Sequence, residues 1–166
     1  MIIRPATQGD IPQVRAIYAA SVLTTAQSFE LEAPSEADMA ARFDAIVSAG
    51  HPYLVAESDD VVLGYCYAGP FRPRPAYAAT FEHSVYVDGE RRGAGIGRAL
   101  MAALMSDLEA KGARQLIAVI GDPDATVSVS FHSALGFEMI GRMREVGRKF
   151  DRWVDILLMQ RAIAGA

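Results

Sequence analysis

A glycine-rich stretch with three arginines is the part of the sequence best suited to bind a charged ligand. It reads Arg91-Arg92-Gly93-Ala94-Gly95-Ile96-Gly97-Arg98 and lies between an apolar segment of strand type and an amphipathic segment of helix type. Glycine permits positive φ angles and a close approach of the backbone to a ligand. A helix start adds unpaired N–H groups and partial positive charge. The stretch therefore predicts a site for an anion such as a pyrophosphate, and Arg92 and Arg98 add charge to it.

Other glycine-rich motifs fit this stretch less well. A dinucleotide-binding unit would carry an acidic residue at the end of the next strand, where this chain has 118–120, Ala-Val-Ile. A nucleoside-triphosphate loop would contain Gly-Lys-Ser/Thr, which the stretch lacks. A tight turn without a ligand is the remaining alternative. The strand before the stretch and the helix after it favour a binding loop.

The elements that position this loop follow from apolar periodicity and turn residues. Asp10 is a candidate N-cap for the first helix, and Ser35 with Asp38 forms a candidate capping box for the second. Three prolines exclude a regular strand over 70–75, and a turn is expected over 147–152. The predicted order is β-α-α-β-β-β-α-β-α-β-β, with strands over 2–4, 53–57, 61–67, 80–87, 115–120, 137–146 and 153–159 and helices over 10–20, 35–50, 95–111 and 126–135. This order predicts an α/β (α+β) protein, in which a mixed, mostly antiparallel sheet of about seven strands carries helices on both faces.

Composition restricts the class of protein. The 166 residues are 51% hydrophobic and 22% charged, which predicts a single globular domain over 1–166 rather than a disordered chain. A net charge of −4 does not indicate a nucleic-acid binder, and no apolar run approaches the ~20 residues of a membrane helix. The one cysteine, Cys66, lies in an apolar run, so we expect a buried thiol rather than a nucleophile, and a cytoplasmic location.

The loop also carries a family resemblance. Residues 92–97 match the pattern Arg/Gln-x-x-Gly-x-Gly/Ala in full, and in this the chain resembles the GNAT superfamily of N-acetyltransferases. Within that superfamily it is similar to the phosphinothricin and methionine sulfoximine N-acetyltransferases. The similar stretches are 28–29, 71–73, 81–87, 92–97, 118–120, 131–137 and 147–153. The resemblance implies the GNAT fold, a homodimer and no metal.

The resemblance further implies acetyl-CoA as co-substrate. It implies that the strand through Val85, Tyr86 and Val87 parts from its neighbour and offers backbone groups to the pantetheine arm, while 93–98 holds the pyrophosphate. In that group an asparagine after the next strand also contacts the cofactor. The matching position here is Asp124, whose carboxylate cannot donate the amide hydrogen bond.

Direct acetyl transfer needs a base for the amine and benefits from a proton donor for the departing sulfur. The resemblance assigns the base to Glu82, and a half-buried carboxylate can have the raised pKa that suits this task. Strand alternation would place Ser84 on the face of Glu82 and His83 on the other face. His132 stands where the group has a histidine and many superfamily members have a tyrosine acid; a structural histidine is the alternative. Backbone N–H groups near 85–87 are expected to polarise the thioester carbonyl.

Positively charged residues predict how the acceptor molecule is bound. Arg72, Arg74 and Lys149 are candidate clamps for a carboxylate or phosphinate, because arginine pairs with such groups through two parallel hydrogen bonds. Phe29 is a candidate wall of the pocket, and the segment 82–84 is expected to contact the substrate.

These residues predict acetylation of the α-amine of a small amino-acid analogue, phosphinothricin or methionine sulfoximine. The alternatives are another amine, such as a protein N-terminus, a polyamine or an aminoglycoside, and a sensor that binds acyl-CoA without turnover. Cations at 72, 74 and 149 argue against the polycationic acceptors. Intact Glu82 and His132 argue against the sensor.

Overall fold

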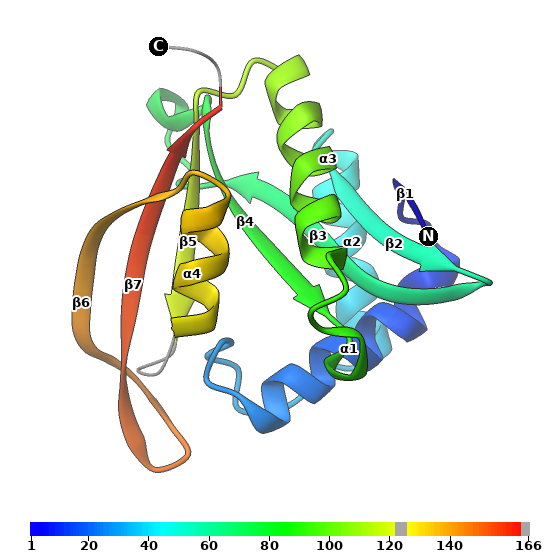
Figure 1. Cartoon of the computed structure of the whole chain (residues 1–166), viewed down its shortest axis with the longest axis horizontal. Helices are drawn as coiled ribbons and strands as arrows, with labels where there is room; N and C mark the ends of the chain where they lie inside the picture. Colours follow the sequence, from blue (N-terminus) through cyan, green and yellow to red (C-terminus); the bar gives the residue numbers. More distant parts are fainter. Residues whose placement is uncertain (122–125, 164–166) are drawn as a thin grey trace.

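The fold is a seven-stranded sheet between two layers of helices, as a computed structural model of the chain shows (Figure 1). The structure describes residues 1–121 and 126–163. The strands lie in the order β1-β2-β3-β4-β5-β7-β6, and only β4 and β5 run parallel. The strands are β1 (Ile2–Pro5), β2 (Tyr53–Ser58), β3 (Val61–Pro70), β4 (Thr80–Val87), β5 (Gln115–Gly121), β6 (Glu138–Lys149) and β7 (Arg152–Ala162). The mixed, mostly antiparallel sheet predicted from the sequence is therefore confirmed.

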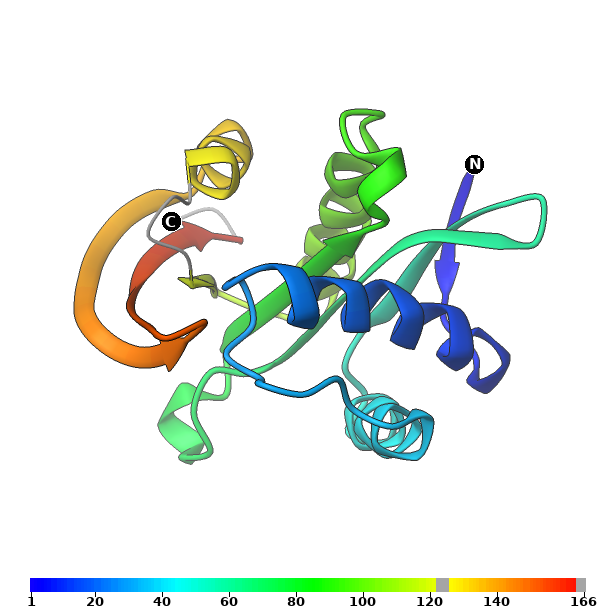
Figure 2. The same cartoon turned by 90° about the horizontal axis from the view of Figure 1, so that it is seen from below.

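Four α-helices cover the sheet, α1 (Ile11–Thr24) and α2 (Glu36–Ser48) on one face and α3 (Ile96–Ala110) and α4 (Thr126–Ala134) on the other (Figure 2). Short 3-10 turns, η1 (Gln8–Asp10), η2 (Pro75–Tyr77) and η3 (Gly89–Arg91), occur in the connections. Each face has its own apolar core. The core on the α1/α2 face contains Val14 and Val22 of α1 and Tyr65 of β3. The core on the α3/α4 face contains Leu100 and Leu104 of α3 and Leu116 of β5. Among the described residues, no helix is both long enough and apolar enough to cross a bilayer.

Two helix starts show how well local signals predict ends. The hydroxyl of Ser35 accepts a hydrogen bond from the Asp38 N–H at 3.1 Å, and the predicted capping box is confirmed. Asp10 stands at the N-cap of α1, but its carboxylate makes no capping bond there. It accepts bonds from Thr7 and Arg4 instead, so Asp10 is the N-cap residue that the sequence predicts, but its side chain does not bond to the helix.

The C-terminal hairpin is longer than the sequence predicts. β6 continues to Lys149 and β7 begins at Arg152, so the expected turn over 147–152 shrinks to Phe150 and Asp151, with φ of 51° and 56°. Left-handed turn positions usually carry glycine or asparagine, and neither occurs here. The twist of the long ladder sets the turn geometry more strongly than the two turn residues do. α1 likewise extends four residues beyond its predicted end, to Thr24.

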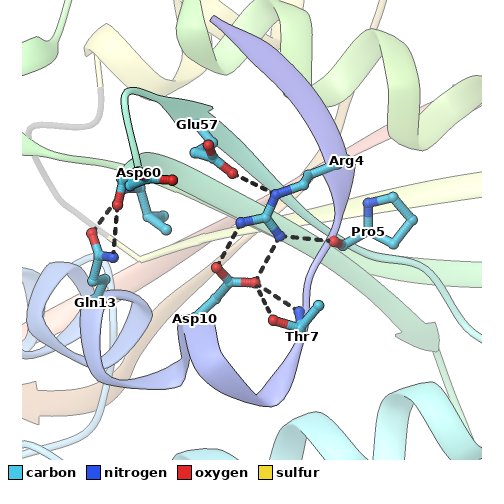
Figure 3. Close-up of polar contacts among 8 residues, drawn as sticks. Arg4, Pro5, Thr7, Asp10, Gln13, Glu57 and Asp60 are labelled. Carbon is cyan, nitrogen blue, oxygen red and sulfur yellow. Dashed lines mark hydrogen bonds and ion pairs between the residues drawn. The ribbon is translucent and has the colours of Figure 1, made fainter.

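Arg4 joins the N-terminal strand to two other elements (Figure 3). Its guanidinium donates two bonds of 2.8 Å to Asp10 and one of 2.6 Å to Glu57 on β2. Next to this cluster, Gln13 on α1 bridges the β2–β3 turn by donating to the Asp60 carbonyl. The bond from Arg4, with help from Thr7, lowers the pKa of Asp10 to about 2, although burial opposes the shift.

We predict that Asp10→Asn lowers the free energy of unfolding at neutral pH by about 2 kcal/mol. This is the free energy that corresponds to a shift of the Asp10 pKa from near 4 in the unfolded chain to about 2 in the folded one. The contribution is present above the unfolded pKa and is lost as the pH falls through the folded pKa. Urea titrations at a series of pH values should therefore show wild type and variant converging below about pH 4. Asp107→Asn, in an exposed ion pair with Lys111, is the control and should change stability little. A constant gap between wild type and Asp10→Asn at every pH would contradict the prediction.

Candidate functional site

A cavity of about 950 Å³ lies where the middle of the sheet opens. β4 pairs with β5 only over four rungs, from Thr80–Gln115 to His83–Ala118. Beyond that point both strands line the cavity, β4 with 84–87 and β5 with 119–121. This is the parting that the sequence resemblance implied for Val85, Tyr86 and Val87. Their backbone groups on this side have no partner in β5 and can bind an extended ligand.

The glycine-rich loop forms one end of the cavity. Gly93 and Gly95 have φ of 82° and 79°, which side-chain-bearing residues rarely adopt. Gly95 is the N-cap of α3 and leaves the first N–H groups of the helix uncovered. Arg92 and Arg98 are exposed beside it. Of the predicted phosphate loop, Arg92, Gly93, Gly95, Ile96, Gly97 and Arg98 line the cavity and Ala94 lies between them.

Gly97 brings the two helices of this face together. A Cβ at this position would lie 3.2 Å from the ring of Phe131 on α4, which also lines the cavity. The missing side chain therefore allows α4 to close the cavity beside the start of α3.

Glu82 and Ser84 lie on the α1/α2 face of β4, as strand alternation predicted. Ser84 lines the cavity, and Glu82 is half-buried one pleat further along the strand. Burial raises the pKa of the Glu82 carboxyl, and the charge of Arg72 partly opposes the shift. This arrangement suits a general base, because a carboxylate with a raised pKa takes a proton more readily.

His83 points to the other face of β4 and meets His132 from α4. Their Nε2 atoms are 3.1 Å apart, and both rings line the cavity. Phe137 packs against the two imidazoles, with ring centroids 5.3 Å and 5.2 Å away. The sequence predicts a substrate contact at His83 and an acid at His132, but not the contact between them. The 48 intervening residues hide this contact.

The candidate acceptor residues occupy three different settings. Arg72 is exposed, with its guanidinium 4.4 Å from the centroid of the Phe71 ring and close enough to act on the charge of Glu82. Arg74 is exposed immediately before η2. Lys149 is only 3% exposed, and its ammonium donates a 2.7 Å hydrogen bond to the Ser28 carbonyl.

Phe29 ties the loop after α1 to the C-terminal hairpin. Its ring lies so close to Gly121 and Gly147 that a Cβ on either would approach within 2.7 Å and 2.2 Å. Lys149 secures the same loop through Ser28, and burial lowers the pKa of its ammonium while Glu30 opposes the shift. These contacts set the position of the loop that borders the cavity at Gln27.

Two groups of residues near the cavity escaped sequence analysis. One face of α1 forms a wall of the cavity through Ala16, Ile17, Ala20, Ser21 and Thr24. The small residues at 16 and 20, one helical turn apart, were the available signal. The second group is a row of aromatic rings beside Ser84 on the same face of the sheet, namely Tyr53, Tyr65 and Tyr67, which stack next to the predicted residue Tyr86.

Asp124, the predicted cofactor contact after β5, lies outside the described residues. Cys66 is buried and donates weakly to the Leu100 carbonyl at 3.6 Å, and burial raises its pKa, so the expectation of a structural thiol is confirmed. Within residues 1–121 and 126–163, no group of three His, Cys, Asp or Glu side chains is placed to hold a metal ion.

Comparison with known proteins places this site in a family. Residues 3–158 match the model of the acetyltransferase (GNAT) domain. The chain is 45% identical over 161 residues to a phosphinothricin N-acetyltransferase of Alcaligenes faecalis, covering 97% of this chain and 82% of the relative. It is 40% identical to an L-methionine sulfoximine/L-methionine sulfone acetyltransferase of Pseudomonas paraeruginosa, covering 95% of this chain and 92% of the relative.

A solved structure agrees in fold and carries the expected ligand. The phosphinothricin acetyltransferase of Sinorhizobium meliloti, crystallised in complex with AcCoA, superposes with a TM-score of 0.93 at 43% identity, covering 97% of this chain and 87% of that one. The parted strands, the glycine-rich loop before α3 and these similarities agree, and the chain belongs to the GNAT family of acetyltransferases.

Proposed function

We propose that this protein transfers the acetyl group of acetyl-CoA directly to the α-amine of a small amino-acid analogue, phosphinothricin or methionine sulfoximine. The observation that carries the proposal is one continuous cavity that runs from an anion-binding loop to a buried histidine pair, with Glu82 beside it. The similarity to enzymes with these substrates, over almost the whole chain, supports the choice of acceptor.

The residues present fit acetyl-CoA. The loop 92–98 offers arginine side chains and uncovered helix N–H groups to the pyrophosphate. The unpaired backbone groups of 85–87 can hold the pantetheine arm as an added strand, and N–H groups of this segment can polarise the thioester carbonyl. Arg72, whose charge acts on Glu82, is the proposed partner of the acceptor's carboxylate or phosphinate, with Arg74 nearby in the chain.

In the proposed reaction both substrates bind together, so no covalent enzyme intermediate is needed. Glu82 removes a proton from the ammonium of the acceptor, directly or through water, and the free amine then attacks the thioester carbonyl. His132 faces the other side of the same opening and supplies a proton to the departing sulfur. Glu82 passes this first proton to solvent and takes a second proton from the nitrogen once the nitrogen is bonded to the acetyl carbon, which leaves a neutral amide.

We expect purified protein with acetyl-CoA to release free thiol when phosphinothricin or methionine sulfoximine is added, and a polyamine to be a poorer acceptor. Glu82→Gln should lower kcat at least about tenfold, because the amide cannot take the proton. In wild type, kcat should fall as the pH drops through the raised pKa of Glu82, and the variant should lack this limb. Glu109→Gln, at an exposed position on α3, is the matched control. Unchanged turnover in Glu82→Gln would exclude Glu82 as the base.

Two glycines with the same backbone conformation allow a controlled test of the predicted phosphate loop. Gly95 and Gly112 both have φ of 79° and open space around a new Cβ, but only Gly95 lines the cavity. Gly95→Ala and Gly112→Ala should therefore carry a similar backbone strain of about 1–2 kcal/mol. We expect only Gly95→Ala to raise the KM for acetyl-CoA, by about tenfold, as initial-rate kinetics would show. A similar KM in the two variants would contradict the assignment of the loop.

We further propose that residues 1–166 form one domain, that the enzyme is cytoplasmic, and that it is a homodimer. The free thiol of Cys66 supports a reducing compartment. An unpaired edge strand with exposed apolar side chains supports the dimer. On β6 and β7 these side chains are Met139, Ile140, Met143, Val146 and Trp153, which are 45% to 61% exposed.

Light scattering after size exclusion should give twice the mass of the chain. Ile140→Glu on β6 should shift the protein towards the monomer, because it places a charge in the apolar interface. Val47→Glu on α2 is a control at a similarly exposed apolar position away from β6. A monomeric wild type would overturn the dimer but not the proposed reaction.

A further inference from the structure

Two buried imidazoles meet in the wall of the cavity, beside the last paired rung of β4 and β5. His83 is 6% exposed and His132 is 5% exposed. A strand rises about 3.3 Å per residue, so His83 lies about 13 Å along β4 from Val87, beside which the phosphate loop begins. A ligand held by its pyrophosphate at the loop would therefore extend its far end towards this pair.

The hydrogen bonds of the two rings determine how many protons they can hold. The Nδ1 of His83 lies 3.1 Å from the Ile117 carbonyl, and the Nδ1 of His132 lies 2.7 Å from the Ser128 carbonyl. A carbonyl oxygen only accepts, so both Nδ1 atoms carry a hydrogen. The two Nε2 atoms then face each other at 3.1 Å.

The contact between the two Nε2 atoms is favourable only when one hydrogen lies between them. With both Nε2 atoms bare, two lone pairs would face each other without a donor between them. With both protonated, two N–H groups and two positive charges would collide. One proton between the Nε2 atoms forms an N–H···N hydrogen bond of ordinary length and satisfies every ring nitrogen.

The surroundings of the pair oppose a second added proton. The rings of Phe131 and Phe137 pack against the imidazoles, and the carbonyls of Ile117 and Ser128 are the polar groups that face them. Among the described residues, the titratable group that acts on the pKa of His83 is His132. Burial lowers the pKa of both rings, and repulsion between them adds to the effect for His83. The pair therefore titrates as one unit.

We propose that His83 and His132 share one proton and act as a single acid in the wall of the cavity. This inference rests on the proposed acetyl transfer. As the amine nitrogen bonds to the acetyl carbon, the carbon–sulfur bond breaks, and the pair donates its shared proton to the sulfur. Both rings are then neutral, each with its Nδ1 hydrogen, while Glu82 holds the second proton of the amine nitrogen, having passed the first to solvent. Exchange with solvent returns a proton to the pair. His83 is a positioning residue that holds the proton through His132.

The chain has three histidines, so selective ¹⁵N-histidine labelling reports on the pair directly. We expect the Nε2 shifts of His83 and His132 to lie between those of bare and protonated nitrogen and to move together in one titration step. His83→Gln should abolish this joint step. His51→Gln, which replaces the third histidine, should preserve it. Two rings that titrate separately, or that both keep bare Nε2 atoms throughout, would overturn the shared proton.

The pH dependence of kcat tests the role of the pair in catalysis. An acid must hold its proton, so kcat should fall as the pH rises through the pKa of the pair. In His83→Leu the N–H···N bond is lost and burial lowers the pKa of His132, so the falling limb should move about one unit lower in pH. His83→Gln can restore a hydrogen bond to His132 but cannot hold the proton, so the fall of kcat at high pH should also differ from that of wild type. His51→Gln should show the same pH dependence of kcat as wild type.

The two measurements separate the possible failures. A wild-type limb in His83→Leu would overturn the acid role even if the NMR shows the shared proton. Absence of acetyl transfer to every amine tested, with the joint titration intact, would count against the proposed function while leaving the shared proton in place. Acetyl transfer by a protein in which the two histidines titrate separately would support the proposed function and count against the shared proton.

Discussion

The arrangement of the whole site depends on the early end of the pairing between β4 and β5. Four rungs hold the two parallel strands together, and after His83 and Ala118 they separate in the middle of the sheet. Interior strands rarely leave backbone groups unpaired, because buried N–H and C=O groups are costly without partners. Here the lost rungs leave a cavity with hydrogen-bonding walls. The same backbone that would complete a sheet is available to an extended ligand.

Charge and burial change along this cavity from one end to the other. At the glycine-rich loop, Arg92 and Arg98 are exposed, and the start of α3 adds its partial positive charge. At the other end, the two histidines lie among aromatic rings and are almost fully buried. The net charge of −4 does not reveal this, since a few local cations determine anion binding. A ligand with phosphates at one end and a reactive group at the other matches both ends.

Local signals in the sequence predict the parts of this arrangement that local chemistry controls. The Ser35 capping box, the glycine-rich loop before α3 and the alternation of Glu82 and His83 on β4 each depend on residues within a few positions of one another. Contacts between distant segments were not predictable in this way. His83 meets His132 because α4 packs beside β5, and Lys149 meets the Ser28 carbonyl because β7 pairs with β5 and carries the C-terminal hairpin.

Glycines at such contacts show the same limit of sequence analysis. Gly121 and Gly147 do not signal a turn, yet the Phe29 ring could not lie where it does if either carried a side chain. Sequence analysis assigned Phe29 to the pocket wall and Lys149 to the substrate, each from residue type alone. In the structure both residues connect the loop after α1 to the C-terminal hairpin. Their effect on acceptor binding would then act through the position of that loop.

The proposed base and acid lie on opposite faces of the sheet, and this requires an opening between the strands. Glu82 and His83 are neighbours on β4, so the pleat directs their side chains to the α1/α2 face and the α3/α4 face, respectively. In a fully paired sheet, no single molecule could contact groups on both faces. Where β4 and β5 separate, a ligand lying in the plane of the sheet can be reached from both sides. One face can thus remove a proton from the amine while the other returns a proton to the sulfur, without the two groups neutralising each other by direct contact.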